Sequence, residues 1–188
     1  MRKTVLVLLI TLCAIVYSSS TVSAQSTADS SALLEIDHAG TNSADQVNYA
    51  AKKAAIKGVL ERYDSPMLGS VDDFMKACRT YNLNCYLLPA IAGLESTFGQ
   101  FTWPGSNNPF GWDRGYMAFK DWGEAIDTVG QGLRENYMNE RGALDVYSIG
   151  PIYSESPTWA ARVHNLMLQF EQEERNNALF FSKSVVEL

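Results

Sequence analysis

The sequence is poor in the residues that carry most metal and nucleophilic chemistry. Its 188 residues include two histidines, His38 and His164, and three cysteines. A histidine-based catalytic triad therefore has few places to form. A zinc site would need ligands from distant parts of the chain, whereas structural zinc ligands usually come in close pairs. Because the chain also has no glycine-rich phosphate loop, we expect no metal, no nucleotide and no other cofactor.

Positive charge is scarce as well. The sequence has 15 Lys and Arg residues and 21 Asp and Glu residues, which gives a formal net charge of −6. The basic residues form no cluster in the sequence. An acidic chain of this kind is a poor candidate for binding nucleic acid or an anionic membrane surface.

The first residues have the three parts of a secretory signal. Arg2 and Lys3 precede an apolar run over 5–17, and Val-Ser-Ala24 offers small residues for cleavage. The run is too short to span a membrane, and no basic stop-transfer segment follows it. We therefore expect residues 1–24 to be a signal peptide of a secreted or cell-envelope protein. An uncleaved segment that anchors the chain in the membrane is the alternative.

Export bears on the two cysteines that remain after cleavage, Cys78 and Cys85. In an oxidising compartment they are candidates for a disulfide. Because spacing alone does not give the distance between them, a pair of free thiols stays open.

Composition and periodicity divide the rest of the chain. Residues 25–44 are rich in Ser, Thr, Ala, Asp and Gly without periodicity, and we expect a flexible stalk there. Residues 45–175 show mainly helical periodicity and are long enough for one domain with a core. Residues 176–188 are interpreted as a C-terminal tail. The fold class predicted is therefore mainly α.

Within this domain we expect a helix from Asp45 to the break at Ser65 and Pro66. Other expected elements are a capping box at 70–73, an N-cap at Asp121, a turn-rich segment over 147–156, and a last helix that starts at Pro157 and has a solvated end at 171–174.

A central helix is predicted from residue 85 or 86 to about Thr97. Pro89 fits its first turn, where the missing N–H would have no partner anyway. Apolar residues cover nearly the whole circumference, which is typical of a buried helix. Glu95 falls in the last turn, where such a helix reaches a surface.

Residues 98–120 change character, because four glycines and two prolines interrupt a stretch rich in aromatic residues. These breaks favour irregular loops or a small hairpin. The aromatic rings of Trp103, Phe110, Trp112 and Tyr116 could stack on the CH faces of sugars, while Asn107, Asn108 and backbone groups near the glycines could bind N-acetyl groups. A second small core made of the same aromatics is the alternative.

Glu95 has the surroundings of a proton donor. Cleavage of a glycosidic bond needs an acid that protonates the departing oxygen, and an ordinary glutamate has lost that proton at neutral pH. A site that is dry on one side penalises the charged form and raises the pKa. Leu94 and Phe98 are apolar neighbours in sequence, and no basic residue is adjacent.

Four segments together resemble a known family: "LLPAIAGLESTFGQ", "NNPFGW", "MAFKDWGEAI" and "IYSESPTWAARV", in this order over roughly 85–170. They are similar to the bacterial glucosaminidase family, formally the mannosyl-glycoprotein endo-β-N-acetylglucosaminidase-like domain of the lysozyme-like superfamily. The Glu-Ser block is shared with lytic transglycosylases, so the ordered series carries the resemblance.

The resemblance implies a lysozyme-like helical domain, with the loop or hairpin lobe beside its cleft, that acts on the glycan strands of peptidoglycan. It implies Glu95 as the catalytic acid and Tyr153 as a second site residue, with saccharide contacts at Asn108, Phe110, Gly111 and Trp112. Family members often carry a second acid in a hairpin between the first two blocks. Here that connection is short, and Asp113 is the acid available before Asp121 and Glu124.

A single acid suffices if the N-acetyl group of the substrate assists, or if the 6-hydroxyl of the sugar attacks in a transglycosylation. The function expected is thus a secreted peptidoglycan hydrolase that cleaves β-1,4 bonds next to N-acetylglucosamine. The alternatives are a lytic transglycosylase with the same Glu95 and a lysozyme-like module that only binds glycan. A helical adaptor explains Glu95 poorly, since an acid at the end of an apolar helix would be an unexplained cost.

Overall fold

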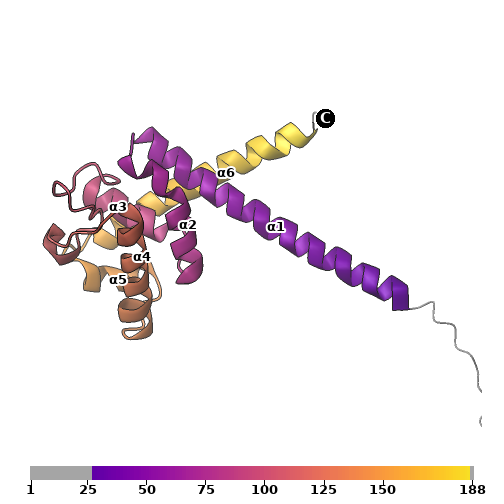
Figure 1. Cartoon of the computed structure of the whole chain (residues 1–188), viewed down its shortest axis with the longest axis horizontal. Coiled ribbons are helices and arrows are strands. Elements are labelled where there is room, and N and C mark those ends of the chain that lie inside the picture. The colour runs from indigo at the N-terminus through magenta and orange to yellow at the C-terminus, as the bar shows by residue number, and fades with distance from the viewer. Residues whose placement is uncertain (1–26, 187–188) are drawn as a thin grey trace, which may run out of the picture. The chain divides into compact units, whose positions relative to one another are not determined.

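The computed structural model describes the backbone of residues 27–186 and the side-chain surroundings of residues 45–178. Within this range the chain is mainly α-helical, with six α-helices and no strand. Their bounds are α1 Thr27–Arg62, α2 Val71–Thr80, α3 Leu87–Ser96, α4 Trp122–Gly132, α5 Val146–Tyr153 and α6 Trp159–Val186 (Figure 1). The mainly α fold class is confirmed. The expected signal peptide lies outside the described residues.

The contacts divide the chain into two units, Met1–Asn42 and Ser43–Leu188, and the features below belong to the second. The helix expected from Asp45 begins at Thr27 instead, so the backbone is helical over most of the segment 25–44, where a flexible stalk was expected. Val47 is 68% exposed, and the buried face of the helix starts further on, at Ala55 and Ile56. No helix of the described range is both long and apolar enough to cross a membrane.

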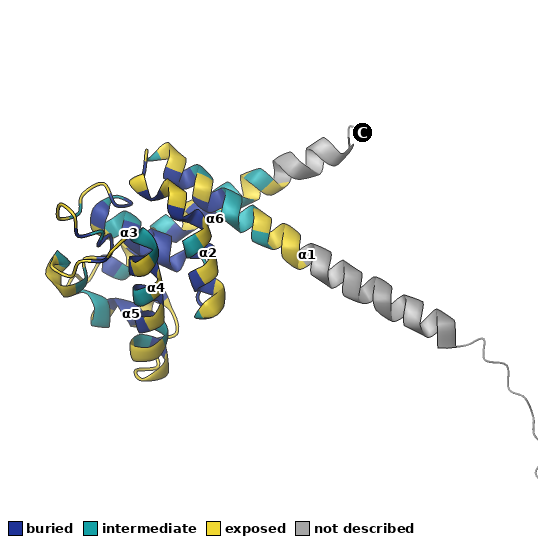
Figure 2. Ribbon diagram, viewed as in Figure 1, coloured by how far each residue is buried: buried dark blue, intermediate teal, exposed yellow. Residues whose placement is uncertain are grey.

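The buried core surrounds α3, as predicted for a helix that is apolar all round. Six residues in a row are buried, from Leu87 to Ala92. α3 contacts α6, α2 and α4, while α2 packs on α4 and α5 packs on α6. Figure 2 shows these buried positions on the inner faces of the helices and exposed ones outside. Pro89 lies in the first turn of α3, as expected.

Two local predictions were wrong. The capping box expected at 70–73 does not form: the side chain of Ser70 makes no capping bond, because the short 3₁₀-helix η1 (Pro66–Ser70) already leads the chain into α2. The segment 147–156 is not all turn, because α5 occupies its first half. There Asp145 and Ser148 form a capping box that starts the helix, and Pro151 lies inside it. By contrast, the expected N-cap at Asp121 is confirmed, since its side chain accepts the N–H of Glu124.

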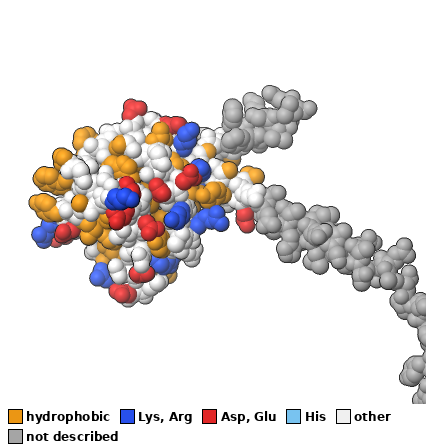
Figure 3. All heavy atoms as spheres, viewed as in Figure 1, with side chains coloured by type: hydrophobic (Ala, Val, Ile, Leu, Met, Phe, Trp, Pro, Cys, Tyr) orange, Lys and Arg blue, Asp and Glu red, His pale blue; other side chains and the backbone are white. Residues whose placement is uncertain are grey.

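Residues 97–121 form an irregular looped lobe without any strand, so the loop alternative is confirmed over the hairpin. Its turn η2 (Trp112–Gly115) is not a regular helix, because Asp113 and Arg114 have left-handed backbone angles (φ 51° and 55°). The lobe exposes several large apolar side chains: Phe101, Trp103, Tyr116 and Met117. In Figure 3 hydrophobic side chains gather on the left edge of the molecule, where Figure 1 shows these loops.

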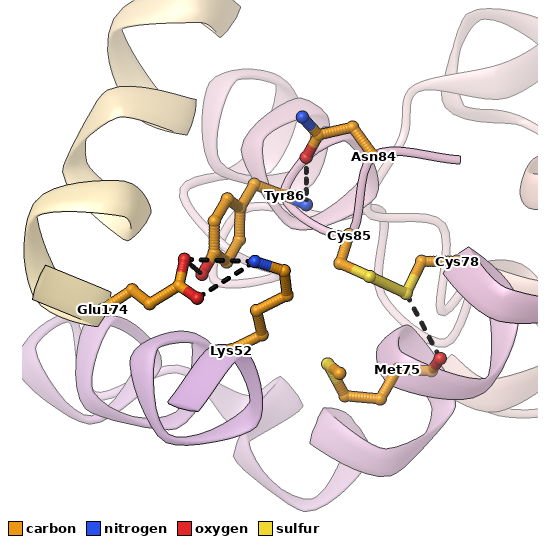
Figure 4. The surroundings of a disulfide bond; sticks show 7 residues. All are labelled: Lys52, Met75, Cys78, Asn84, Cys85, Tyr86 and Glu174. Carbon is orange, nitrogen blue, oxygen red and sulfur yellow. Dashed lines mark hydrogen bonds and ion pairs between the residues drawn. A yellow bond between two sulfur atoms is a disulfide. The ribbon is translucent and has the colours of Figure 1, made fainter. Parts of the chain in front are cut away.

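Cys78 and Cys85 form a disulfide that ties the end of α2 to the turn before α3. Next to it, Tyr86 donates its hydroxyl to Glu174 at 2.6 Å, and Lys52 pairs with the same carboxylate at 3.0 Å (Figure 4). These bonds connect the start of α3 to α1 and α6. The prediction that 171–174 forms a solvated helix end was therefore wrong: α6 runs on, and Glu174 is partly buried among these partners.

Candidate functional site

The end of α3 is fixed by Ser96, the residue after Glu95. The Ser96 hydroxyl lies 3.0 Å from the carbonyl of Ala92 and 2.9 Å from that of Pro109, and it accepts the N–H of Gly99 at 2.9 Å. These bonds hold the lobe against the last turn of α3. Thr97 then adopts a left-handed conformation (φ 51°) and ends the helix. Glu95 consequently projects from a rigid element next to the lobe.

The carboxylate of Glu95 lies against two neighbours. Its Oε1 accepts a hydrogen bond from the indole Nε1 of Trp159 at 2.6 Å. Its Oε2 lies 3.4 Å from the point where a Cβ on Gly111 would stand. Glu95 as a residue is exposed, so the carboxyl group is dry on one side and open on the other.

Burial raises the pKa of Glu95 above its ordinary value of 4.5, while the Trp159 hydrogen bond and the positive charge of Arg162 act in the opposite direction. The direction agrees with the expectation from sequence. Phe98, expected to supply the dry surface, packs instead on Gly93, Tyr63 and Phe170. The neighbour of the carboxylate is Trp159, which contacts it through the indole N–H.

Tyr153, the last residue of α5, connects this carboxylate to the lobe. Its hydroxyl donates to the backbone carbonyl of Phe110 at 2.8 Å, and its ring stacks on Trp159 with centroids 4.7 Å apart. Burial, followed by the negative charge of Glu95, raises the pKa of Tyr153 well above its ordinary value of 10. Tyr153 therefore remains a neutral hydrogen-bond donor at any working pH.

A groove of about 640 Å³ opens beside Tyr153. Its walls come from the lobe and from the segment after α4, with the lining residues Gly111, Trp112, Asp113, Arg114, Asn136, Tyr137, Glu140, Arg141 and Tyr153. Glu95 is not among these; it adjoins the groove through Gly111 and Tyr153. The wall after α4 includes a π-helical turn, η3 (Leu133–Asn139), a rare geometry that is frequent at functional sites.

Asn108 and Phe110, expected to contact saccharide, are buried. Phe110 is 0% exposed and Asn108 is 4% exposed. The amide group of Asn108 donates to the carbonyls of Trp112 and Met117, and its oxygen accepts the N–H of Trp112. These side chains therefore shape the lobe and present Gly111 and Trp112 at the groove. Asn107 is used in the same way, donating to the carbonyls of Phe119 and Lys120.

Trp103 and Tyr116 lie elsewhere in the lobe and stack on each other at 5.8 Å. They are 58% and 69% exposed and line a smaller hollow of about 220 Å³, which shares no lining residue with the groove. The lobe thus contains both predicted kinds of aromatic residue: Phe110 belongs to the core, while Trp103 and Tyr116 offer exposed ring faces.

Two carboxylates line the groove that Glu95 adjoins, those of Asp113 and Glu140. Asp113, the partner predicted from sequence, is exposed and lines it. Glu140 lines the same groove and was missed, because nothing in its local sequence distinguishes it from a surface glutamate. Glu124 accepts the backbone N–H of Lys120 at the start of α4.

The contact of Trp159 with Glu95 was missed as well, although Trp159 belongs to "IYSESPTWAARV", one of the four segments that carry the family resemblance. The two residues are 64 positions apart, and no local pattern reports a pairing over that distance. Tyr137, which is not among the site residues predicted from the sequence, lines the groove and packs on Tyr153.

The residues whose side chains are described include no group of three metal-ligating side chains. No protein-family model matches the chain, and no curated protein matches it significantly in sequence.

Proposed function

We propose that this protein is a secreted peptidoglycan hydrolase with a lysozyme-like helical domain, related to the bacterial glucosaminidases. It cleaves β-1,4 glycosidic bonds next to N-acetylglucosamine, and Glu95 is its general acid. The observation that carries the proposal is the half-dry carboxyl group of Glu95, which adjoins a groove through Gly111 and Tyr153. The disulfide between Cys78 and Cys85 is compatible with an oxidising compartment.

The environment of Glu95 suits proton donation. A general acid must hold its proton at the working pH and must also reach the substrate. Burial raises the pKa of Glu95 in spite of the opposing Trp159 hydrogen bond, and the exposed side of the residue leaves a path to a bound glycan. The ion pairs among the described residues do not include Glu95, so no salt bridge holds its carboxylate in the charged form.

The groove suits a sugar chain. It is open, mixed in polarity and flanked by the rings of Trp112, Tyr137 and Tyr153, which could stack on sugar faces. The exposed pair Trp103 and Tyr116 would hold a more distant part of the glycan strand. Asn108 and Phe110 would act by holding the lobe in shape.

One acid at the cleavage point favours assistance by the substrate. Glu95 would protonate the glycosidic oxygen while the bond from C1 to that oxygen breaks. The carbonyl oxygen of the neighbouring N-acetyl group would then bond to C1, and water would open the resulting ring. Asp113 would orient the N-acetyl group or the water, and Tyr153 would hold the lobe carbonyl that borders the reacting sugar.

The test compares wild type with Glu95→Gln on purified cell walls, measuring both sugar release and binding to insoluble glycan. We expect the variant to release at least roughly 100-fold less sugar while binding glycan as well as wild type does. Glu155→Gln removes an exposed carboxylate in the turn between α5 and α6 and serves as control. If wild type and Glu95→Gln bind equally and release equally little, the chain is a binding module. If neither binds glycan, the proposal fails.

Product analysis distinguishes hydrolysis from the lytic transglycosylase reaction. Hydrolysis leaves a reducing sugar end, whereas attack by the 6-hydroxyl leaves a 1,6-anhydro sugar. We expect reducing ends that carry N-acetylglucosamine. Anhydro ends would keep the role of Glu95 and overturn the assignment as a hydrolase.

A further inference from the structure

The hydrogen bond from Trp159 involves only one of the two carboxyl oxygens of Glu95. The indole N–H is a donor only and has no proton to give up under working conditions. It bonds to Oε1 at 2.6 Å, whereas Oε2 faces the bare backbone of Gly111 at the groove. A protonated carboxyl group has one carbonyl oxygen, the better acceptor, and one hydroxyl oxygen. The bonded Oε1 is therefore the carbonyl oxygen.

We propose that Trp159 is a positioning residue that fixes which oxygen of Glu95 carries the proton. Oε1 accepts the indole N–H, and Oε2 holds the proton on the side of Gly111 and the groove. The inference rests on the proposed function in one respect: the proton on Oε2 is taken to be the one transferred to the glycan. Which oxygen carries the proton is argued only from the contacts of Oε1 with Trp159 and of Oε2 with Gly111.

The indole itself is held on three sides. Trp159 is 3% exposed, and its backbone N–H bonds to the carbonyl of Ser156 at the start of α6. Its ring stacks on Tyr153, whose hydroxyl is bonded to the lobe at Phe110. Behind it α5 comes so close that a Cβ on Gly150 would stand 3.4 Å from the Trp159 ring and 2.9 Å from the Cβ of Ala160. A ring packed in this way cannot follow a rotation of the carboxyl group.

The arrangement links four segments that are far apart in sequence. The lobe holds Tyr153 through Phe110, Tyr153 packs on Trp159, and Trp159 bonds to Glu95 at the end of α3. Besides Trp159, the titratable or charged groups that influence or respond to Glu95 are Tyr153 on α5 and Arg162 on α6. Neither makes a hydrogen bond or an ion pair with Glu95, so the preference between Oε1 and Oε2 is assigned to Trp159.

The first test follows the ionisation of Glu95 by ¹³C NMR of protein labelled at the glutamate carboxyl carbon, with Glu95→Gln identifying the resonance. Trp159→Phe keeps a ring and removes the donor. Because the indole N–H favours the ionised carboxylate, we expect the pKa of Glu95 to rise in this variant. Trp122→Phe, a substitution of an indole on α4 with no bond to Glu95, should leave it unchanged. An unchanged or lower pKa in Trp159→Phe would overturn the inference.

The second test needs no variant at Trp159 and therefore holds even if Trp159→Phe does not fold. The ¹⁵N-edited spectrum of wild type contains indole N–H signals, and those of Trp103, Trp112 and Trp122 are assigned by substitution, which leaves Trp159. We expect its N–H signal to shift with the same midpoint as the Glu95 carboxyl carbon, and to lose that shift in Glu95→Gln. If the indole N–H signal of Trp159 does not shift as Glu95 ionises, the hydrogen bond is refuted.

Activity separates this inference from the proposed function. If wild type cleaves glycan, Trp159→Phe should lower kcat/KM roughly 10- to 100-fold, as expected for a misplaced catalytic group, and should extend activity to higher pH. If wild type does not cleave glycan, the proposed function fails, and the two NMR tests still decide the role of Trp159.

Discussion

The hydroxyl group of Tyr153 donates a hydrogen bond of 2.8 Å to the backbone carbonyl of Phe110. This bond joins the end of α5 to the lobe at the residue before Gly111, and Gly111 is the backbone that borders the Glu95 carboxylate. The position of the lobe relative to Glu95 therefore depends on a hydroxyl group that lies 43 residues further along the chain.

Tyr153→Phe should weaken both stability and activity. Phe110 is fully buried, and a buried carbonyl left without a donor costs about 1–3 kcal/mol. We expect a loss of unfolding free energy in that range, measured by urea denaturation, together with reduced sugar release. Tyr147→Phe removes a hydroxyl from an exposed tyrosine of the same helix and should change neither quantity. Equal behaviour of the two variants would show that the Tyr153 bond is without consequence.

Gly111→Ala should affect activity more than its backbone cost explains. Gly111 has φ +70°, and a Cβ there would stand 3.4 Å from Oε2 of Glu95. Gly142 has a similar φ of +67° with no atom within 4 Å of its Cβ position, so Gly142→Ala is a matched control. Both variants should lose about 1 kcal/mol of stability from the left-handed backbone. Only Gly111→Ala should lower sugar release, and an equal effect of the two on activity would contradict the site.

Glu95→Gln should make the protein more stable at neutral pH. Burial raises the pKa of Glu95, so the folded state binds this proton more tightly than the unfolded state does. The stability that this provides is fully present below the ordinary pKa of 4.5 and is lost as the pH rises through the folded-state pKa. The glutamine does not ionise and keeps an oxygen for the indole N–H.

Urea denaturation should therefore give a higher midpoint for Glu95→Gln than for wild type at pH 7 and similar midpoints at pH 4. Glu155→Gln, at an exposed carboxylate, should show no such divergence with pH. A Glu95→Gln variant that is less stable than wild type at pH 7 would mean that the charged carboxylate is well satisfied in the fold, which excludes the raised pKa.

Reduction of the disulfide should lower the unfolding free energy by about 2–3 kcal/mol, because the bond closes a short loop with a sequence separation of 7. The measurement compares urea unfolding of wild type with and without a thiol reductant. In the double variant Cys78→Ser/Cys85→Ser the reductant should have no effect. If the reductant does not change the unfolding free energy of wild type either, Cys78 and Cys85 are not paired in solution.

The parts of this molecule that sequence predicts well are those governed by local periodicity. The apolar circumference of α3 predicted a buried helix with Pro89 in its first turn and Glu95 in its last. The breaks of 98–120 predicted an irregular lobe. Where prediction failed, two local signals competed: Gly150 and Pro151 suggested a turn, while the capping box at Asp145 and the burial of Ile149 produced α5.

The sequence predicted the acid of the candidate site, Glu95, better than it predicted the residues around that acid. Glu95 stands out because an acid in an apolar segment is rare. By contrast, Asn108 looked like a ligand and proved to be bonded within the lobe, because an amide that satisfies backbone groups has the same sequence signal as one that faces a substrate. Trp159 donates its indole N–H to Glu95 through a contact that depends on the packing of α6 against α3, which no local pattern contains.

The central claim, that Glu95 donates the proton to the departing oxygen, is tested most directly by changing the leaving group. The values of kcat/KM for wild type and Glu95→Gln are compared on a chitooligosaccharide and on an aryl glycoside of the same sugars with a dinitrophenolate leaving group. Dinitrophenolate departs without protonation, so we expect a loss of at least roughly 100-fold on the oligosaccharide and little loss on the aryl glycoside. An equally large loss on both substrates would contradict the role of Glu95 as general acid.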